Sequence, residues 1–268
     1  MDETTKIIRD YYDTKVEAEW NRIAGRPEFR LTCRFLDRYI HPGDCVLDIG
    51  GGPGRYALYL AEKGCDVTLL DLSGENVAFA RKQAEARHVR LRAVTGDART
   101  ADEQIAETFD HVLLMGPLYH LLGEAGRVRA ITAALHLLKP GGIFFASFIN
   151  LFAGMIYEMK IEPGLAISGD PNHLDYMESF LAEQSFAGDA FTKAFFIAQN
   201  EVLPFMSRFP LEKLHLIGQE SITSPCENNI MSQPKEVVDV WLDLCEKICE
   251  REDLLSWSEH LMYIGRKL

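Results

Sequence analysis

A glycine-rich turn follows the first strongly apolar run of the chain, in the stretch VLDIGGGPGR. Gly50, Gly52 and Gly54 give this turn a G-x-G-x-G spacing, and Asp48 stands two residues before the first glycine. Glycines let a backbone turn tightly from strand to helix and approach a ligand closely. A dinucleotide fingerprint needs its third glycine where Arg55 stands, and a Walker-type loop needs Gly-Lys-Ser/Thr. The turn therefore predicts a ligand other than a dinucleotide or a Walker-bound phosphate.

Two further carboxylates follow the next two apolar runs. Asp71 lies near the end of VTLLDLS, with Leu72 after it, and Asp97 lies in VTGDA, with Ala98 after it. A carboxylate accepts hydrogen bonds at two oxygens and donates none, which suits it to bind two hydroxyl groups or an amino group. One acid at a strand end is usually a helix cap or a solvated loop residue. Three acids in this order, with the glycines, favour a binding site.

Histidines are the candidate catalytic residues, because imidazole is the side chain best suited to accept a proton near neutral pH. His120 follows GPLY, just past the fourth apolar run, and His260 precedes the last apolar run of the chain. His173 lies in the long segment between them and is a weaker candidate. For each histidine the alternative is a hydrogen-bonded structural role.

Strand and helix patterns alternate between residues 44 and 150, and they must position these groups. The expected strands are 45–49, 67–70, 91–94, 111–115 and 143–148, and the expected helices are 56–63, 75–87 and 125–138. This alternation predicts a doubly wound α/β fold, in which a parallel sheet has helices on both faces. Ligands of such sheets bind beyond the carboxyl ends of the strands, where the strand order reverses. The glycine turn lies at that point.

The rest of the chain predicts three further regions around this core. Residues 1–40 are expected to form a helical cap, and residues 41–150 the Rossmann-like core. Residues 151–199 are too long for a simple connection and predict a lid, with a helix at 173–184. Residues 200–268 are expected to complete the sheet, with helices at 201–209 and 235–250 and strands at 213–217 and 261–264.

The charge balance excludes some partners. Lys and Arg number 28 and Asp and Glu number 40, which gives a net charge of −12. Proteins that neutralise phosphates are usually basic, so nucleic acids and anionic membranes are not expected partners. The start MDETTKIIRDYYD lacks the basic head and apolar run of a signal peptide, and we expect a cytoplasmic protein. The six cysteines form no CxxC pair, so we expect free thiols and no metal site.

Five segments in this order resemble the class I S-adenosylmethionine-dependent methyltransferases. VLDIGGGPG resembles their first motif, VTLLDLS the second, VTGDA the element after strand three, FDHVLLMGPLYHLL the fourth strand, and LLKPGGIFFASF the approach to strand five. YYDTKVEAEWNR, PEFRLT and SEHLMYIGRK resemble features of a bacterial, small-molecule-type subgroup with only a generic methyltransferase name. The resemblance implies a mostly parallel seven-stranded sheet whose last strand is antiparallel, which would bring His260 to the cofactor side.

The resemblance also implies roles for individual residues. Asp71, with Leu72 beside it, would bind the ribose hydroxyls, and Asp97 and Ala98 would bind adenine. Met115 would lie under the methionine part of S-adenosylmethionine, and Tyr12 would contact its methionine end. Asp48 would either contact the cofactor or hold the glycine loop through backbone N–H groups.

The expected activity is transfer of a methyl group to a small-molecule acceptor by in-line displacement, for which the protein mainly aligns the reactants. Residues 144–209 hold 13 of the 27 aromatic residues, which fits either a pocket for an aromatic or apolar acceptor or the lid's own core. The alternatives are an inactive cofactor-binding regulator, an aminopropyltransferase-like enzyme and, less favoured because of Arg55, a nicotinamide oxidoreductase. The acceptor atom, the use of a base and the oligomeric state stay open.

Overall fold

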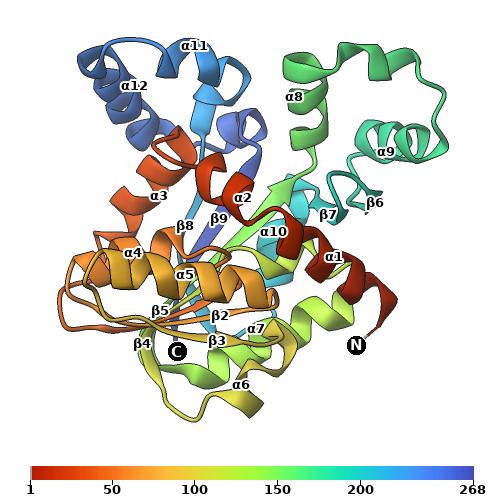
Figure 1. Ribbon diagram of the computed structural model, residues 1–268. Coiled ribbons are helices and arrows are strands. Elements are labelled where there is room, and N and C mark those ends of the chain that lie inside the picture. Colours follow the sequence, from red (N-terminus) through yellow and green to blue (C-terminus); the bar gives the residue numbers. More distant parts are fainter. Residues whose placement is uncertain (1) are drawn as a thin grey trace.

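Strands and helices alternate through the first half of the computed structural model, which describes residues 2–268 (Figure 1). In order, the elements are β1 (Cys45–Ile49), α4 (Arg55–Glu62), β2 (Asp66–Asp71), α5 (Gly74–Ala86), β3 (Arg92–Thr95), α6 (Ala101–Gln104), β4 (Phe109–Leu114), α7 (Glu124–Leu137) and β5 (Leu138–Asn150). The five strands pair in parallel in the order β3-β2-β1-β4-β5. The doubly wound α/β fold is therefore confirmed, and the strand order reverses between β1 and β4.

Two C-terminal strands complete a seven-stranded core sheet. β9 (His260–Lys267) pairs antiparallel with β5, and β8 (Leu211–Gly218) pairs antiparallel with β9. α10 (Gln199–Met206) precedes β8, whereas α11 (Glu227–Met231) and α12 (Lys235–Ile248) lie between β8 and β9. The antiparallel last strand is confirmed. Because β9 runs against β5, its first residue, His260, lies opposite Ile149 near the carboxyl end of β5.

The segment after β5 contains more structure than the single helix expected there. It forms α8 (Phe152–Ile161), α9 (Pro171–Leu181) and a hairpin of β6 (Phe186–Asp189) and β7 (Lys193–Ile197). β7 joins the end of β5 through Ile149 and Asn150, so the hairpin extends the core sheet. Aromatic residues of α9 and the hairpin form their own apolar cluster around Tyr176, Phe186 and Phe196. The division of the chain into cap, core, lid and completing segment stays a prediction.

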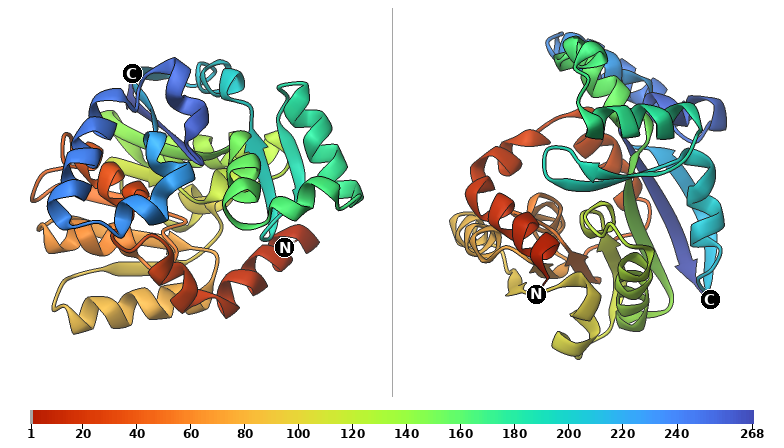
Figure 2. Two further views of the ribbon diagram at one scale, coloured as in Figure 1. Left: turned by 90° about the horizontal axis from the view of Figure 1, so that it is seen from above. Right: turned by 90° about the vertical axis from the view of Figure 1, so that its right-hand side faces the viewer.

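The N-terminal helices α1 (Glu3–Thr14), α2 (Val16–Arg22) and α3 (Pro27–Leu36) precede the sheet. α1 begins after Asp2, whose carboxylate accepts a hydrogen bond from the Thr5 backbone N–H, as a helix N-cap does. α1 packs against α5 and β7, and α3 packs against α12 (Figure 2). This arrangement places α1 between the core and the β6–β7 hairpin.

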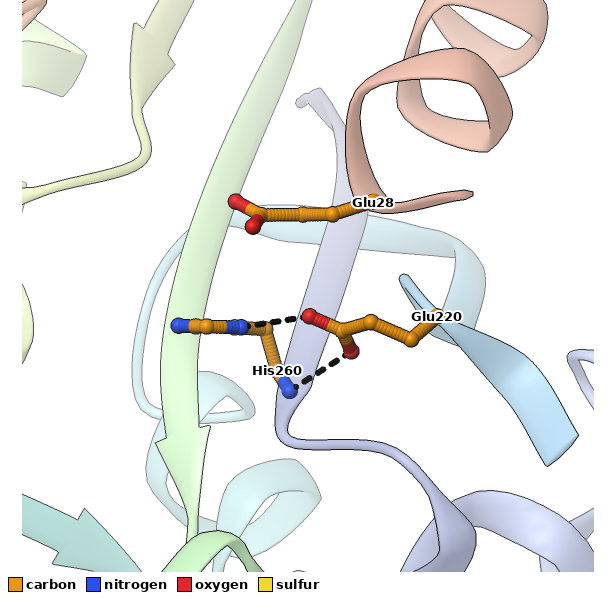
Figure 3. Close-up of side chains that lie close together, drawn as sticks. All are labelled: Glu28, Glu220 and His260. Carbon is orange, nitrogen blue, oxygen red and sulfur yellow. Dashed lines mark hydrogen bonds and ion pairs between the residues drawn. The ribbon is translucent and has the colours of Figure 1, made fainter. Parts of the chain in front are cut away.

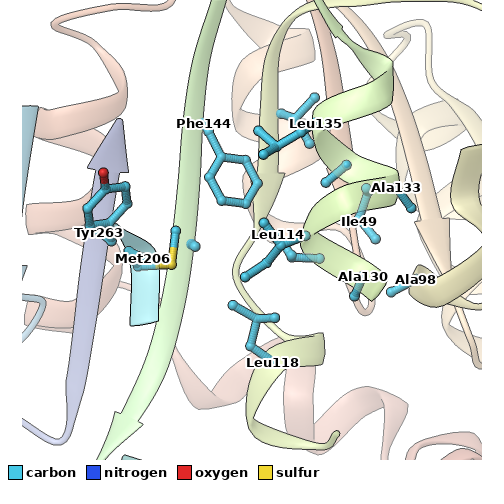
Figure 4. Close-up of a cluster of buried hydrophobic side chains, with 14 of the residues drawn as sticks. Ile49, Ala98, Leu114, Leu118, Ala130, Ala133, Leu135, Phe144, Met206 and Tyr263 are labelled. Atoms are coloured by element: carbon cyan, nitrogen blue, oxygen red, sulfur yellow. The ribbon is translucent and has the colours of Figure 1, made fainter. Parts of the chain in front are cut away.

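The main apolar core lies between the sheet and α7 (Figure 4). Ile49, Leu114 and Phe144 are fully buried there, and Leu135 of α7 covers them. Burying a large aliphatic or aromatic side chain contributes about 1.5–3 kcal/mol. The core therefore fixes the strand ends from which the loops of the site emerge. In the described part of the chain, helices are too short or too polar to cross a membrane.

Candidate functional site

A cavity lies at the carboxyl ends of β1, β2, β3 and β4, beneath α1. Ten sequence-predicted residues line it: Tyr12, Asp48, Gly50, Gly52, Asp71, Leu72, Asp97, Ala98, Met115 and His120. Gly54 and His260 do not line it. The cavity therefore lies at the reversal of strand order, where ligands of doubly wound sheets bind.

The three glycines of the turn have different tasks. Gly50 has φ +72°, and a Cβ there would lie 2.4 Å from the Pro117 ring, so the position allows the loop after β4 to approach. Gly52 has φ +56° and borders the cavity, and a Cβ there would have its nearest neighbour 4.0 Å away. Gly54 has φ +91°, and a Cβ there would lie 3.1 Å from the Cβ of Ala80 in α5. Only Gly52 therefore keeps the space in front of the loop free for a ligand.

Replacing Gly52 with Ala should weaken binding of S-adenosylhomocysteine (the demethylated form of S-adenosylmethionine) about tenfold, because a methyl group would enter the cavity. Both substitutions should lower the free energy of unfolding by about 1–2 kcal/mol, because an alanine is strained at the positive φ of either glycine, whereas Gly54→Ala should leave the ligand affinity unchanged. Calorimetric titration and urea unfolding of both variants measure the two effects. Equal losses of affinity in the two variants would contradict this assignment.

Asp48 has a buried carboxylate with spare acceptor capacity. Its side chain is 2% exposed, and its Oδ2 has no hydrogen-bond partner among the described residues. Burial and the nearby charge of Asp71 raise the pKa of Asp48 to about 7. A buried polar atom without a partner is rare and costly. The position is suited to accept a hydrogen bond from an amino or ammonium group of a ligand.

Asp71 connects the glycine loop to the start of α5. Its Oδ2 accepts from the Gly52 backbone N–H (2.8 Å), and its Oδ1 accepts from the Ser73 backbone N–H (2.9 Å) and the Asn76 side chain (3.2 Å). Burial raises the pKa of Asp71, and these hydrogen bonds oppose that rise. A carboxylate has about four acceptor positions. The chain uses three of them, which leaves room for a donor from a ligand.

Asp97 is held in an ion pair rather than left open. The Arg99 guanidinium binds both of its oxygens, with Nη2 2.5 Å from Oδ2. Burial would raise the pKa of Asp97, but the hydrogen bonds and charge of Arg99 lower it overall. Arg99 also contacts Asp2 and Thr5 of α1. A ligand amino group at Asp97 would therefore share this carboxylate with Arg99.

His120 connects α1, the turn after β4 and the β6–β7 hairpin. Its Nδ1 lies 3.0 Å from the Lys193 carbonyl of β7, which can only accept, so Nδ1 carries the proton. Its Nε2 lies 2.7 Å from the Tyr12 hydroxyl and accepts a hydrogen bond from it. Burial lowers the pKa of His120 to about 4, which keeps the imidazole neutral at pH 7. It can act as a base only for a group that replaces the Tyr12 hydroxyl.

The neutral state of His120 should make folding sensitive to acid. An unfolded histidine takes up its proton below pH ~6.5, whereas His120 in the folded protein does so only near pH 4. The stability linked to this histidine is therefore complete above pH ~6.5 and is lost as the pH falls toward 4, by up to about 3 kcal/mol. Urea unfolding of wild type and His120→Asn between these pH values should show a flatter pH dependence in the variant. Parallel curves would contradict the buried neutral histidine.

His260 lies at the wall of a different cavity and forms a pair with Glu220 (Figure 3). Its Nδ1 is 2.6 Å from Glu220 Oε1, and its backbone N–H donates to Oε2 at 3.0 Å. Ser258 Oγ donates to the same Oε2 at 2.7 Å. Burial alone would lower the pKa of His260, but the charges of Glu220 and Glu28 raise it to about 9.

Glu28 and Glu220 are the acidic residues of this site that the sequence does not reveal. One ligand-type atom from each of Glu28, Glu220 and His260 lies within 4.8 Å of the others. They come from α3, from the loop after β8 and from the start of β9, and no short segment links them. The oxygens of Glu220 already accept hydrogen bonds from Ser258 and His260, so the group is a hydrogen-bonded pair with Glu28 beside it.

Three further side chains lie at the two cavities. Arg22 lines the first cavity and pairs with Glu19 and Glu28. Arg55 stacks on the Trp20 ring at 3.5 Å. His173 lines the second cavity, where its Nδ1 is 3.3 Å from Glu158 Oε1.

Comparison with known proteins agrees with this geometry. A family model described as a methyltransferase domain matches residues 46–142. A ubiquinone biosynthesis O-methyltransferase of Methylocella silvestris is 37% identical over 131 residues, which are 48% of this chain and 47% of the relative. A glycine/sarcosine N-methyltransferase of Aphanothece halophytica is 27% identical over 193 residues, 69% of each chain. The match to the first of these relatives thus spans about half of its length.

Solved structures with the same fold include two methyltransferases. The 1,6-didemethyltoxoflavin-N1-methyltransferase of Burkholderia thailandensis has a TM-score of 0.60 at 16% identity, over 98% of this chain and 88% of its own. The magnesium protoporphyrin IX methyltransferase of Synechocystis has a TM-score of 0.58 at 15% identity, over 99% of this chain and 100% of its own. Residues 46–142 are thus similar to a methyltransferase domain, and the seven-stranded sheet with its antiparallel last strand has the fold of these solved methyltransferases.

Proposed function

We propose that this protein transfers a methyl group from S-adenosylmethionine to a small-molecule acceptor. The observation that carries the proposal is the convergence of the glycine loop, the unpartnered oxygen of Asp48 and the remaining acceptor position of Asp71 on one cavity within the described residues. The match of residues 46–142 to a methyltransferase-domain model and the similarity to curated methyltransferases support it.

The residues of the first cavity fit the parts of this cofactor. Asp71 would accept from a ribose hydroxyl, and Asp97 and Ala98 would face adenine. Asp48 would accept from the amino group at the methionine end, where Gly52 leaves space for close approach. When bound, the cofactor supplies the electrophilic methyl group and its leaving group. The chain's own task is then to hold the acceptor in line and to exclude water.

Two contacts would close the methionine end. Tyr12 of α1 forms a hydrogen bond with His120, and Met115, which follows β4, also lines the cavity. Lys193 of the β6–β7 hairpin accepts the second hydrogen bond of His120. Displacing the Tyr12 hydroxyl would therefore free a neutral imidazole at the methionine end of the cofactor site. We propose in addition that the acceptor is aromatic or apolar and that the enzyme works in the cytoplasm.

Binding measurements test the cofactor assignment. Isothermal titration calorimetry should detect binding of S-adenosylmethionine and S-adenosylhomocysteine, and no binding of NAD at the same concentrations. Decarboxylated S-adenosylmethionine tests the aminopropyltransferase alternative and should bind more weakly than the intact cofactor. Binding of NAD alone, or no heat from any adenosyl ligand, would contradict the proposal. Release of S-adenosylhomocysteine with a panel of acceptors would separate an enzyme from a cofactor-binding regulator.

A further inference from the structure

A second cavity of about 440 Å³ lies between α8, α9, the β6–β7 hairpin and the start of β9. Five of its lining residues are aromatic: Tyr157, Tyr176, Phe186, Phe191 and Phe196. Such walls suit a flat apolar body, as in most sites for small organic ligands. The cavity therefore has the size and surface of an acceptor site.

Carboxylic acids are the most numerous ionisable groups in the lining of this cavity, which also contains His173 and His260. Five carboxylates line it: Glu158, Glu162, Asp170, Asp189 and Glu259. Within the described chain, Lys and Arg are absent from its lining. Glu259 pairs with Lys160 at 2.7 Å, and Asp189 pairs with Lys193 at 2.5 Å. Both lysines lie outside the lining.

The other three carboxylates have no Lys or Arg partner among residues 2–268. Asp170 caps α9 through the His173 backbone N–H, and Glu158 faces the His173 imidazole, which is a cation only when protonated. Glu162 is exposed at the rim. Of these three carboxylates only Glu158 is buried, and the exposed Glu162 and Asp170 act on a ligand through their negative charge. The wall therefore favours a ligand with a positive charge.

Side chains that line this cavity contact side chains that line the first. The rings of Tyr119 and His260 have centroids 6.2 Å apart, and Tyr119 lines the first cavity whereas His260 lines the second. In the same way Phe191 of the second cavity packs edge-on against His120 of the first, at 5.7 Å. The two cavities are therefore neighbours, separated here by the rings of Tyr119 and His260.

In the Glu220–His260 pair, one ring nitrogen of His260 has no hydrogen-bond partner among the described residues. Glu220 accepts from Nδ1, which fixes the proton of the neutral ring on Nδ1 and makes Nε2 the acceptor. Nε2 has no hydrogen-bond partner in the described residues, and it points away from Glu220 (Figure 3). His260 lines the second cavity, and its free Nε2 can therefore receive a proton from a ligand.

We propose that the second cavity binds the methyl acceptor, that the acceptor is an amine on an aromatic or apolar body, and that His260, oriented by Glu220, takes the proton of its ammonium form. This inference rests on the proposed methyltransferase function. The ammonium N–H bond breaks, and its proton goes to neutral His260 Nε2. The freed nitrogen lone pair forms the bond to the methyl carbon, and the carbon–sulfur bond breaks with its electron pair left on sulfur. The products are a methylated ammonium and S-adenosylhomocysteine.

The charged and titratable groups around His260 set the pH at which it can act. They are Glu220, Glu28 of α3, Arg22 of α2, Tyr119 after β4, and Glu259 beside it in the chain. Burial lowers the pKa of the free imidazole, whereas Glu220 and Glu28 raise it to about 9 against burial and the charge of Arg22. The pair should therefore favour methyl transfer at alkaline pH. A bound ammonium would repel the imidazolium and shift the active range toward neutral pH.

Binding of two matched probes tests the charge preference. Tyramine and 3-(4-hydroxyphenyl)propanoate share the same ring and differ in the charge at the end of a short chain. In calorimetric titrations of the protein saturated with S-adenosylhomocysteine, tyramine should bind about tenfold more tightly or better. Equal or tighter binding of the carboxylate, or no binding of tyramine at millimolar concentration, would overturn the acceptor assignment.

Two lid variants locate the tyramine site. Glu162→Lys places a cation at the rim of the second cavity and should weaken tyramine binding about fivefold. Glu178→Lys makes the same charge change on α9 outside the lining and should leave it unchanged. Equal effects of the two variants would show that tyramine binds elsewhere and would overturn the proposal.

The role of Glu220 has a readout that needs no acceptor. In NMR titrations of the histidine ring nitrogens, the pKa of His260 should be near 9 in the wild type. In Glu220→Gln it should fall well below that value, because only Glu28 then opposes the effect of burial. A pKa unchanged by Glu220→Gln would overturn the pair. S-adenosylhomocysteine affinity, measured on the same samples, separates these outcomes from failure of the cofactor site.

Discussion

Replacing Asp71 with Asn should weaken S-adenosylhomocysteine binding about 100-fold, because the amide can no longer accept on both sides. In the wild type, Asp71 accepts from the Gly52 backbone N–H on one oxygen and from Ser73 and Asn76 on the other. The amide NH2 of Asn must replace one of these oxygens, so this NH2 donor then faces the N–H donors of Gly52 or of Ser73 and Asn76. A hydrogen bond to a charged group contributes about 1.5–3 kcal/mol, and a factor of ten corresponds to about 1.4 kcal/mol.

The loss has two parts that act on the same ligand. The oxygen that faces the cavity disappears as a ribose acceptor, and the Gly52 N–H loses the bond that fixes the glycine loop. Calorimetric titration of Asp71→Asn with S-adenosylhomocysteine measures the combined loss of affinity. Asp66→Asn is the matched control, because Asp66 begins the same strand, β2, at its far end and is exposed. Unchanged affinity in Asp71→Asn would contradict the cofactor site proposed for the first cavity.

The core could be predicted from the sequence because its signals are local. Apolar runs of five or six residues followed by glycines or acids predict buried parallel strands, and β1 occupies Cys45–Ile49 as expected. The acids at strand ends, Asp71 and Asp97, then meet at one cavity through the topology alone. The carboxyl ends of parallel strands share one edge of the sheet, so spacing along the chain becomes proximity in space.

The lid and its acidic partners could not be predicted in the same way. β6 has only four residues, one of them Gly188, and it is held by pairing with β7 rather than by a strong apolar pattern. Glu28 looks like an ordinary helix residue near the start of α3, and Glu220 like a loop residue after β8. Their contact with His260 depends on how α3 and β9 pack, which no local spacing encodes. The sequence therefore predicted the residues that line the first cavity better than the residues that surround His260.

The second prediction with a large effect concerns the free energy of unfolding. A substitution in the first cavity should here stabilise the protein. Asp48→Asn should raise the free energy of unfolding at pH 8 by up to about 4 kcal/mol, because it removes a buried negative charge whose Oδ2 has no partner among residues 2–268. An unfolded aspartate is ionised above pH ~4, whereas the folded carboxyl ionises only near pH 7. Between these values the folded state binds the extra proton, so the wild type gains stability as the pH falls from 7 toward 4.

The difference in the free energy of unfolding between Asp48→Asn and the wild type should therefore be largest above pH 7 and should vanish near pH 4. Urea unfolding of both proteins at pH 8, 6 and 4 measures it, with exposed Asp66→Asn as a control that should show no such trend. The same variant should bind S-adenosylhomocysteine about tenfold more weakly, because a neutral amide attracts an ammonium group less than a carboxylate does. A binding group that costs stability in the empty protein is what a preformed ligand site requires. A variant that is less stable at pH 8, or that binds the ligand as tightly as the wild type, would place Asp48 among the structural residues of the loop.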